Sequence, residues 1–241
     1  MKILITKNYD EMSQKAFKIM KEVVTDNPNA VLGLATGSTP IGLYRLMIED
    51  YMRNGTSYKD VKTVNLDEYV GLDYSSDQSY IYFMREHLFD HIDIDLKNVN
   101  IENGKAADRQ AECERYSRLL REMQQDIQIL GIGSNGHIAF NEPGTPFGST
   151  THIVDLTEST IKDNSRLFND IGDVPRQAFT MGIKNIMNAK KIVILATGAN
   201  KAKAVQGLVC GPVDESLPAS VLQLHPDCTL ICDEAAGALL G

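Results

Sequence analysis

The sequence predicts an α/β fold in which a mostly parallel β-sheet is flanked by helices on both faces. Two observations carry this prediction. Short apolar runs alternate with longer amphipathic stretches throughout the chain, and no linker, low-complexity tract or internal repeat divides it. A chain of 241 residues is also long enough to bury one large core. We therefore expect a single doubly wound, Rossmann-like α/β domain over residues 1–241.

Each expected strand is a short apolar run of the kind that parallel sheets bury on both faces. These runs cover residues 2–6, 31–35, 61–66, 127–131, 191–196 and 228–232. The expected helices have apolar side chains at helical spacing and cover residues 9–25, 41–54, 79–89, 108–125 and 200–208, with a short helix after residue 232. Pro40 suits the first turn of its helix, and residues 157–169 form a further polar, helix-like segment.

The charge balance argues against a general nucleic-acid-binding role. The chain has 24 Lys and Arg against 32 Asp and Glu, whereas nucleic acid backbones require dense basic patches. The N-terminus lacks the apolar segment of a signal peptide, and no apolar run reaches the ~18 residues of a membrane span. The four cysteines are scattered without metal-ligand spacing. We therefore expect no metal site, no membrane partner and structural thiols in the reducing cytoplasm.

Ligands of parallel α/β sheets bind beyond the carboxyl ends of the strands, so we expect the chemistry in the loops that follow strands. The loop of Thr36, Gly37, Ser38 and Thr39 offers hydroxyl groups, close backbone approach and a helix N-terminus, which together suit a phosphate group. An ordinary turn with a capping Ser or Thr would have the same composition. Both interpretations stay open from this segment alone.

Two further loops carry acid–base side chains. Asp67 and Glu68 directly follow an apolar strand, where a carboxylate can act as a base or can cap a helix. The glycine-rich run 131–142 contains Asn135, His137 and Glu142, and a histidine held by a carboxylate is the usual general base near neutral pH. The Gly- and Pro-containing residues after Glu142 open a segment at about 144–180 that we expect to form a small lid.

Two cations complete the set of candidate side chains. Arg166 lies in the polar segment 157–169, and Lys201 begins the helix after the strand at 191–196. A lysine at a helix N-terminus is unfavourable for the helix dipole unless an anion lies nearby. Each of the two could equally be a solvated surface charge.

At the level of motifs, the chain resembles the glucosamine-6-phosphate deaminases of the glucosamine/galactosamine-6-phosphate isomerase family. The resemblance extends over essentially the whole chain in the same order. It rests on Leu34-Ala-Thr-Gly-Ser-Thr-Pro40, Asn65-Leu-Asp-Glu-Tyr-Val-Gly71, Gly131-Ile-Gly-Ser-Asn-Gly-His-Ile-Ala-Phe-Asn-Glu-Pro143 and Leu222-Gln-Leu-His-Pro226.

The resemblance implies a sugar-phosphate-isomerase-like fold and an enzyme without a cofactor. The implied reaction opens the ring of glucosamine 6-phosphate, isomerises it and hydrolyses the resulting imine to fructose 6-phosphate and ammonia, which we class as a combined hydrolase and isomerase–deaminase activity. In the implied site the phosphate is bound by Thr36, Gly37, Ser38, Thr39, Arg166 and Lys201. Asp67 would move the proton from C2 to C1, and His137, supported by Glu142, would open the ring.

The chain departs from some members of the family at two places. Asn135 stands where some members carry an aspartate, so we expect Asn135 to orient the site and Glu142 to supply the charge. His152 and Val154 stand where members activated by N-acetylglucosamine 6-phosphate carry basic residues, which predicts a non-allosteric enzyme.

Two other functions compete with the deaminase. A 6-phosphogluconolactonase-like hydrolase shares the architecture but needs no base for the C2 proton, so the Asp67 motif favours the deaminase. A non-catalytic sugar-phosphate-sensing domain would have no need to keep both Asp67 and His137. The expected partner is a small amino-sugar phosphate, and the sequence leaves a monomer and a homo-oligomer equally open.

Overall fold

The computed structural model describes residues 1–157, 161 and 174–241. Its main feature is a seven-stranded sheet in which all neighbouring strands are parallel. From one edge to the other, the strands are β1 (Lys2–Thr6), β10 (Cys228–Asp233), β9 (Ile192–Ala196), β6 (Ile127–Gly131), β2 (Val31–Leu34), β3 (Lys62–Asn65) and β5 (Val99–Asn100). The predicted parallel α/β fold is therefore confirmed.

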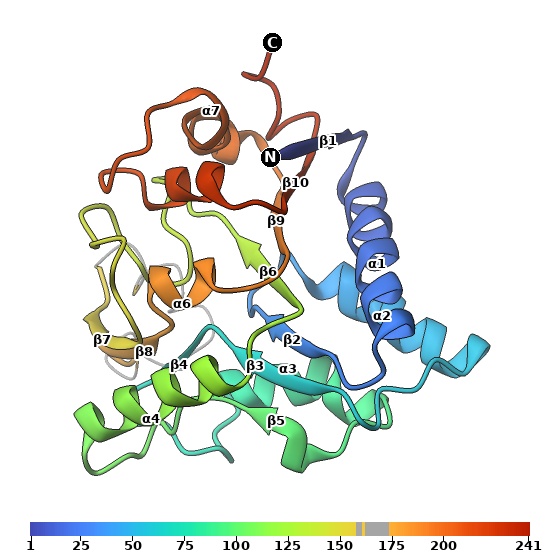
Figure 1. The fold of residues 1–241 in the computed structure, drawn as a ribbon, viewed down its shortest axis with the longest axis vertical. Coiled ribbons are helices and arrows are strands. Elements are labelled where there is room, and N and C mark those ends of the chain that lie inside the picture. The colour runs from blue at the N-terminus through green and yellow to red at the C-terminus, as the bar shows by residue number, and fades with distance from the viewer. Residues whose placement is uncertain (158–160, 162–173) are drawn as a thin grey trace.

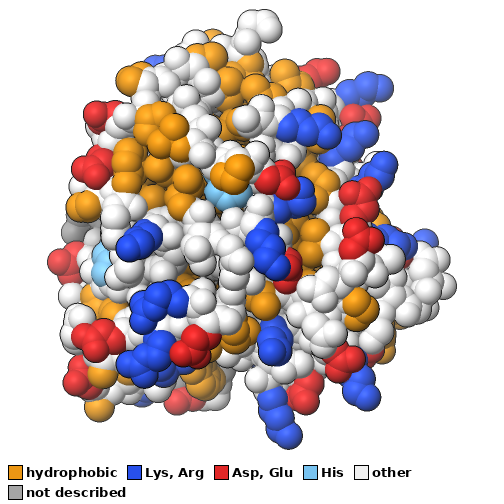
Figure 2. All heavy atoms as spheres, viewed as in Figure 1, with side chains coloured by type: hydrophobic (Ala, Val, Ile, Leu, Met, Phe, Trp, Pro, Cys, Tyr) orange, Lys and Arg blue, Asp and Glu red, His pale blue; other side chains and the backbone are white. Residues whose placement is uncertain are grey.

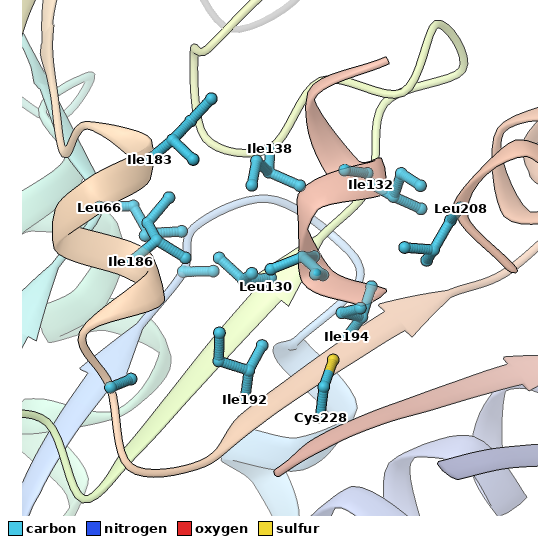
Figure 3. Packing of buried hydrophobic residues seen from close by; sticks show 14 of the residues in the cluster. Leu66, Leu130, Ile132, Ile138, Ile183, Ile186, Ile192, Ile194, Leu208 and Cys228 are labelled. Carbon is cyan, nitrogen blue, oxygen red and sulfur yellow. The ribbon is translucent and has the colours of Figure 1, made fainter. Parts of the chain in front are cut away.

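Helices cover both faces of this sheet because successive strand side chains point to opposite faces and most are apolar. One face packs against α1 (Tyr9–Asp26), α2 (Ile41–Asn54) and α3 (Tyr80–His87). The first two of these helices lie on the right in Figure 1. The other face packs against α4 (Arg109–Glu122), α6 (Ile183–Met187) and α7 (Ala202–Cys210). Figure 3 shows side chains such as Leu130 of β6 and Ile192 of β9 within this second cluster, together with Ile186 of α6.

A second, antiparallel sheet of three strands adjoins the first, and the sequence did not predict it. Its order is β4 (Asp67–Tyr69), β8 (Gln177–Thr180) and β7 (His152–Asp155). These strands are three or four residues long, and the pairing partners lie far apart in the sequence. Alternation over so few residues gives no period that predicts a strand. The strand expected at 61–66 accordingly ends at Asn65, and a separate strand begins at Asp67.

Several other boundaries differ from the prediction. The short helix expected after residue 232 is wrong: residues 234–239 form turns, because Asp233 accepts the N–H of Ala236 and its carbonyl accepts the N–H of Gly237. The remaining short elements, none of them predicted, are β5, α6 and the 3-10 helices η1 (Phe89–His91), η2 (Leu96–Asn98), η5 (Ala199–Lys201) and η6 (Pro218–Leu224). The helix expected at 157–169 and much of the expected lid at 144–180 lie outside the described residues.

The strand order places a topological switch point between β2 and β6. From β2 the chain continues outward to β3 and β5, and from β6 it continues in the opposite direction to β9 and β10. Connections that leave in opposite directions open a crevice beyond the carboxyl ends of the two strands, and ligands bind there in sheets of this kind. The loops after β2 and β6 are among those that the sequence predicts to carry chemistry. In the part of the chain that is described, no helix is long and apolar enough to cross a membrane.

Candidate active site

The loop between β2 and α2 presents backbone and hydroxyl groups at the switch point. Gly37 has φ +88°, a left-handed conformation that suits glycine, and its neighbours Thr36, Ser38 and Thr39 are half-buried or exposed. Pro40, the residue before α2, makes no side-chain capping hydrogen bond, and the first turn of the helix contains no acidic residue. The alternative of a capping Ser or Thr is therefore not observed, and the positive end of the helix dipole is available to an anion.

Two tyrosines hold this loop in place. The hydroxyl of Tyr9 donates to the carbonyl of Ser38 at 3.0 Å and accepts the N–H of Gly42 at 2.7 Å. The hydroxyl of Tyr44 donates to the carbonyl of Ala35 at 2.6 Å and accepts its N–H at 3.1 Å. The loop is thus fixed from α1 on one side and from α2 on the other.

The two carboxylates that follow β3 have different roles in the structure. Glu68 accepts hydrogen bonds from the N–H groups of Tyr69, Tyr80 and Ile81 and so caps the start of α3. Asp67 is 7% exposed, and among the described residues no group donates a hydrogen bond to its carboxylate. Burial, with a smaller contribution from the charge of Glu68, raises the pKa of Asp67 to about 8. Such a carboxylate is a stronger base than an ordinary aspartate.

The loop after β6 brings Asn135, His137 and Glu142 together. Nδ1 of His137 lies 3.4 Å from Oε1 of Glu142, a distance that allows charge stabilisation but is long for a hydrogen bond. Asn135 donates from Nδ2 to Oε2 of Glu142 at 2.7 Å and accepts the backbone N–H of His137 at 3.2 Å. The nearby imidazole of His137 and the hydrogen bond from Asn135 lower the pKa of Glu142. Asn135 therefore positions the carboxylate and the backbone rather than the imidazole ring itself.

The imidazole of His137 lies directly against the backbone of Gly133. A Cβ atom at position 133 would lie 2.3 Å from Cε1 of the ring, so only glycine allows the ring this place. The Gly133 N–H also donates to the carbonyl of His137 at 2.9 Å, which closes the loop on itself. Ala139, two residues after His137, has φ +51°, a conformation that costs energy for a residue with a Cβ atom.

Residues Thr180 and Met181 join the His137 loop to the strand of Asp67. Thr180 pairs with Asp67 across β8 and β4, and its hydroxyl accepts the N–H of Phe140 at 3.1 Å. The carbonyl of Met181 accepts the side-chain amide of Asn141 at 2.9 Å, and the Met181 N–H donates to the carbonyl of Leu66. The two acid–base segments are therefore held to the same short piece of β8.

A third loop, between β9 and α7, places Lys201 at the same edge of the sheet. Asp233, at the end of the adjacent β10, accepts the Thr197 hydroxyl at 2.5 Å and the Gly198 N–H at 3.0 Å. Lys201 ends η5 and is the residue before the first turn of α7, so this helix begins two residues later than the sequence predicts. Because β9 is the neighbour of β6, this loop lies beside that of His137. Arg166, the other predicted cation, lies outside the described residues.

Two other features have structural explanations. His225 is buried, accepts the Asp227 N–H at Nδ1 and donates from Nε2 to the carbonyl of Ala189 at 2.8 Å. It lies before β10, at the edge of the sheet opposite to the candidate site, so it anchors a turn. Within the described ranges, no group of three or more His, Cys, Asp or Glu side chains is arranged to hold a metal ion.

Sequence reasoning identified the three loops but missed the groups that position them. These groups are the side chains of Tyr9, Tyr44, Thr180 and Asp233. All except Tyr44 contact residues that are distant along the chain. No periodicity or spacing in one sequence predicts such contacts. The sequence leaves helix capping open as a role for either carboxylate, and the structure assigns this role to Glu68.

The fold and these loops define an α/β protein with an acid–base site at the switch point of a parallel sheet. The chain belongs to the family of glucosamine-6-phosphate isomerases and 6-phosphogluconolactonases, whose model matches residues 6–231. It is 55% identical over 240 residues to a glucosamine-6-phosphate deaminase of Lactobacillus johnsonii, with 100% of this chain and 98% of the relative covered. It is 53% identical over 237 residues to one of Halalkalibacterium halodurans, covering 98% and 96%.

Solved structures agree with this assignment. A monomeric glucosamine-6-phosphate deaminase superposes with a TM-score of 0.96 at 46% identity, covering 99% of this chain and 100% of the other. The 6-phosphogluconolactonase of Trypanosoma brucei has a TM-score of 0.79 at 19% identity, covering 100% and 98%, and so shares the fold. The deaminases match the chain at about half identity over its full length, whereas the likeness to this lactonase at 19% identity shows a shared fold alone.

Proposed function

We propose that the protein is a glucosamine-6-phosphate deaminase that converts glucosamine 6-phosphate to fructose 6-phosphate and ammonia. The observation that carries the proposal is the presence of two separate acid–base groups on one edge of the sheet. These are the buried carboxylate of Asp67 and the pair of His137 and Glu142. A sugar that must be both opened and isomerised requires both groups, whereas hydrolysis of a lactone requires no base for a C–H proton. The names of the relatives at 53–55% identity support the same activity.

Substrate binding is assigned to the loops at the switch point. The phosphate would be bound by Thr36, Gly37, Ser38 and Thr39 with the N-terminus of α2 and by Lys201. Arg166 is added to this set from the family resemblance. Binding the phosphate far from the reacting carbons fixes C1 and C2 in register, which is the contribution expected of remote contacts. A lid over the bound sugar would come from the part of segment 144–180 outside β7 and β8, because these two strands are held in the small sheet with β4.

The chemistry divides between the two acid–base groups. His137 takes the proton of the C1 hydroxyl as the bond from C1 to the ring oxygen breaks, and the ring oxygen gains a proton as it leaves. Glu142, held by Asn135, stabilises the imidazolium that forms. Asp67 then removes the C2 proton and returns it to C1, giving a ketose imine. Water attacks the imine carbon, and ammonia leaves with its electron pair. No cofactor takes part in these steps.

The reaction class is isomerisation with deamination, and the hydrolytic part is confined to the final imine. The expectation of a hydrolase is therefore too broad as a classification of the enzyme. We propose the cytoplasm as its compartment, because the four cysteines, all of them described, are free thiols.

The proposal is tested by supplying the purified protein with glucosamine 6-phosphate and, separately, with 6-phosphogluconolactone. We expect equal amounts of ammonia and fructose 6-phosphate from the first compound and no enzymatic hydrolysis of the second. Lactone hydrolysis without ammonia release would assign the protein to the lactonase branch of its family. Binding of the amino-sugar phosphate without turnover would instead indicate a sensing domain.

A further inference from the structure

A small cleft lies between α4 and the residues that lead into β7. Its volume is about 240 Å³, and the residues that matter for its chemistry are Ser117, Arg118 and Arg121 of α4 together with Thr150 and Thr151. Thr150 and Thr151 end the connection from β6 to β7, but none of the residues assigned to the candidate active site lines the cleft. The cleft is therefore separate from the site assigned above.

Among the described residues, the two arginines of this cleft have no carboxylate partner. Arg118 and Arg121 are one helical turn apart, and in the described structure neither forms an ion pair. The other arginines of the same helix are engaged: Arg115 binds Glu112 at 2.6 Å, and Arg109 donates to Gln177 at 2.7 Å. In a chain with a net charge of −8, two neighbouring unpaired guanidinium groups form an attractive position for an anion. Figure 2 shows Lys and Arg side chains gathered over α4, at the lower left.

The hydroxyl of Thr151 provides a second, independent observation. Thr151 is only 5% exposed, and its Oγ1 has no hydrogen-bond partner in the described structure. Its backbone N–H donates to Oγ of Ser117 at 3.1 Å, which fixes the threonine against α4. Buried polar groups are nearly always hydrogen-bonded, so an unpartnered hydroxyl at the border of a cleft is the expected mark of a missing ligand oxygen.

One carboxylate also borders the cleft and must be included in the charge balance. Glu114 accepts a hydrogen bond from Nε2 of Gln110 at 3.2 Å, so its carboxylate already has one hydrogen-bond donor on its own helix. Two guanidinium groups against one carboxylate leave a net positive charge. That balance favours an anion over a cation.

A larger cleft near β5 provides a comparison, because its arginines already have carboxylate partners. It measures about 540 Å³ and is bordered by Arg85 and Arg115, but Arg85 already binds Asp90 at 3.0 Å and Arg115 already binds Glu112. The larger cleft therefore has no unpaired charge on Arg85 or Arg115. The smaller cleft is therefore the better candidate for a ligand.

We propose that the cleft between α4 and β7 binds a phosphate-class anion. Arginine guanidinium groups bind phosphate oxygens in a bidentate manner, and the hydroxyls of Ser117, Thr150 and Thr151 supply further donors. The cleft is smaller than the roughly 300–1,000 Å³ of pockets for drug-sized ligands, which suits inorganic phosphate or a small phosphomonoester. This binding activity goes beyond the proposed deaminase function and does not depend on it.

Hydrogen exchange measured by mass spectrometry tests the proposal, because it locates the bound ligand. With inorganic phosphate added to the wild type, we expect slower exchange in peptides that cover residues 113–121 and 149–155. The double variant Arg118→Gln/Arg121→Gln should lose this protection, and Thr151→Val should weaken phosphate binding by at least about 10-fold. The matched control Arg53→Gln/Lys59→Gln removes the same charge elsewhere and should behave as the wild type.

Phosphate that binds only at the candidate active site would instead slow exchange around residues 36–42. The absence of protection at 113–121 and 149–155 in the wild type, or its persistence in the Arg118→Gln/Arg121→Gln variant, would overturn the proposal. Repeating the titration with glucose 6-phosphate distinguishes the two sources of the anion. Tighter binding of the ester identifies a phosphorylated metabolite as the ligand, and tighter binding of phosphate identifies the free ion.

Discussion

At the scale of single residues, burial and close contact distinguish side chains that have the same chemistry. Asp67 and Glu68 are adjacent carboxylates, yet Glu68 is occupied by three backbone N–H groups and Asp67 receives none from the described residues. His137 and His225 are both imidazoles, yet His225 is bonded at both nitrogens to its surroundings. In each pair, the residue whose polar atoms remain available is the one assigned to the chemistry.

The ring of His137 should be sensitive to one added carbon atom. In Gly133→Ala the new methyl group would meet the ring at 2.3 Å, so the imidazole must shift. A shift of about 1 Å at a reacting group lowers the rate by about 10²-fold, and we expect a loss of this size in kcat/KM. Gly131→Ala is the matched control, because its Cβ atom would meet no heavy atom within 4 Å. Equal activity of the two variants would contradict the assigned ring position.

The raised pKa of Asp67 should also appear in the stability of the protein. Its pKa is about 8 in the folded chain, against about 3.9 for an aspartate in an unfolded chain. Between these values the folded state holds a proton that the unfolded state has lost, so the free energy of unfolding decreases as the pH rises from about 4 to about 8. Asp67→Asn removes this titration. The Tm of the variant relative to wild type should therefore rise across this pH range, and a constant difference from pH 5 to 9 would exclude the raised pKa.

At the scale of elements, the site is built by loops that neighbouring elements hold from the side. The loop after β2 is held by tyrosines of α1 and α2, and the loop after β9 is held by Asp233 of β10. The loop after β6 is attached to β8, the strand that pairs with β4. The small antiparallel sheet therefore connects the two acid–base groups that the proposed reaction requires.

Removing the hydroxyl of Tyr9 should loosen the loop of residues 36–39, to which we assign the phosphate. Tyr9→Phe deletes two hydrogen bonds, to Ser38 and Gly42, and each such bond contributes about 1 kcal/mol. We expect the KM for glucosamine 6-phosphate to rise roughly 5- to 30-fold, with a smaller change in kcat. In Tyr51→Phe, a control on α2, the lost hydroxyl makes no hydrogen bond in the described structure, and KM should not change. A lower Tm for Tyr9→Phe with an unchanged KM would restrict Tyr9 to a role in stability.

The sequence predicts the elements whose signals are local. Six strands of the central sheet and the helices α1, α2, α3, α4 and α7 follow from apolar runs and helical periodicity. The strands β4, β5, β7 and β8 do not, because two to four residues with distant partners leave no pattern. The same limit applies to the site. Its loops were visible in the sequence, but the contact of Asn135 with Glu142 instead of the imidazole depends on a loop geometry that composition does not determine.

At the scale of the whole molecule, the strand order concentrates the candidate residues at one edge. All seven strands of the main sheet are parallel, so the loops after β2, β6 and β9 and the start of β4 meet beyond their carboxyl ends. The connections diverge between β2 and β6, which is where sheets of this kind bind their ligands, and the loop after β2 and the His137 loop follow these two strands. A sugar phosphate placed there would have its phosphate on the helix N-terminus of α2 and its C1 and C2 atoms toward His137 and Asp67.

The most direct test of this account measures ammonia released from glucosamine 6-phosphate by the wild type, by Asp67→Asn and by Asp73→Asn. We expect ammonia and fructose 6-phosphate from the wild type and a fall of at least about 10²-fold in Asp67→Asn, because a general base is lost. Asp73→Asn, an exposed acid a short distance along the chain, should keep the wild-type rate. No ammonia from the wild type would contradict the proposed function, and a full rate in Asp67→Asn would contradict the role assigned to its buried carboxylate.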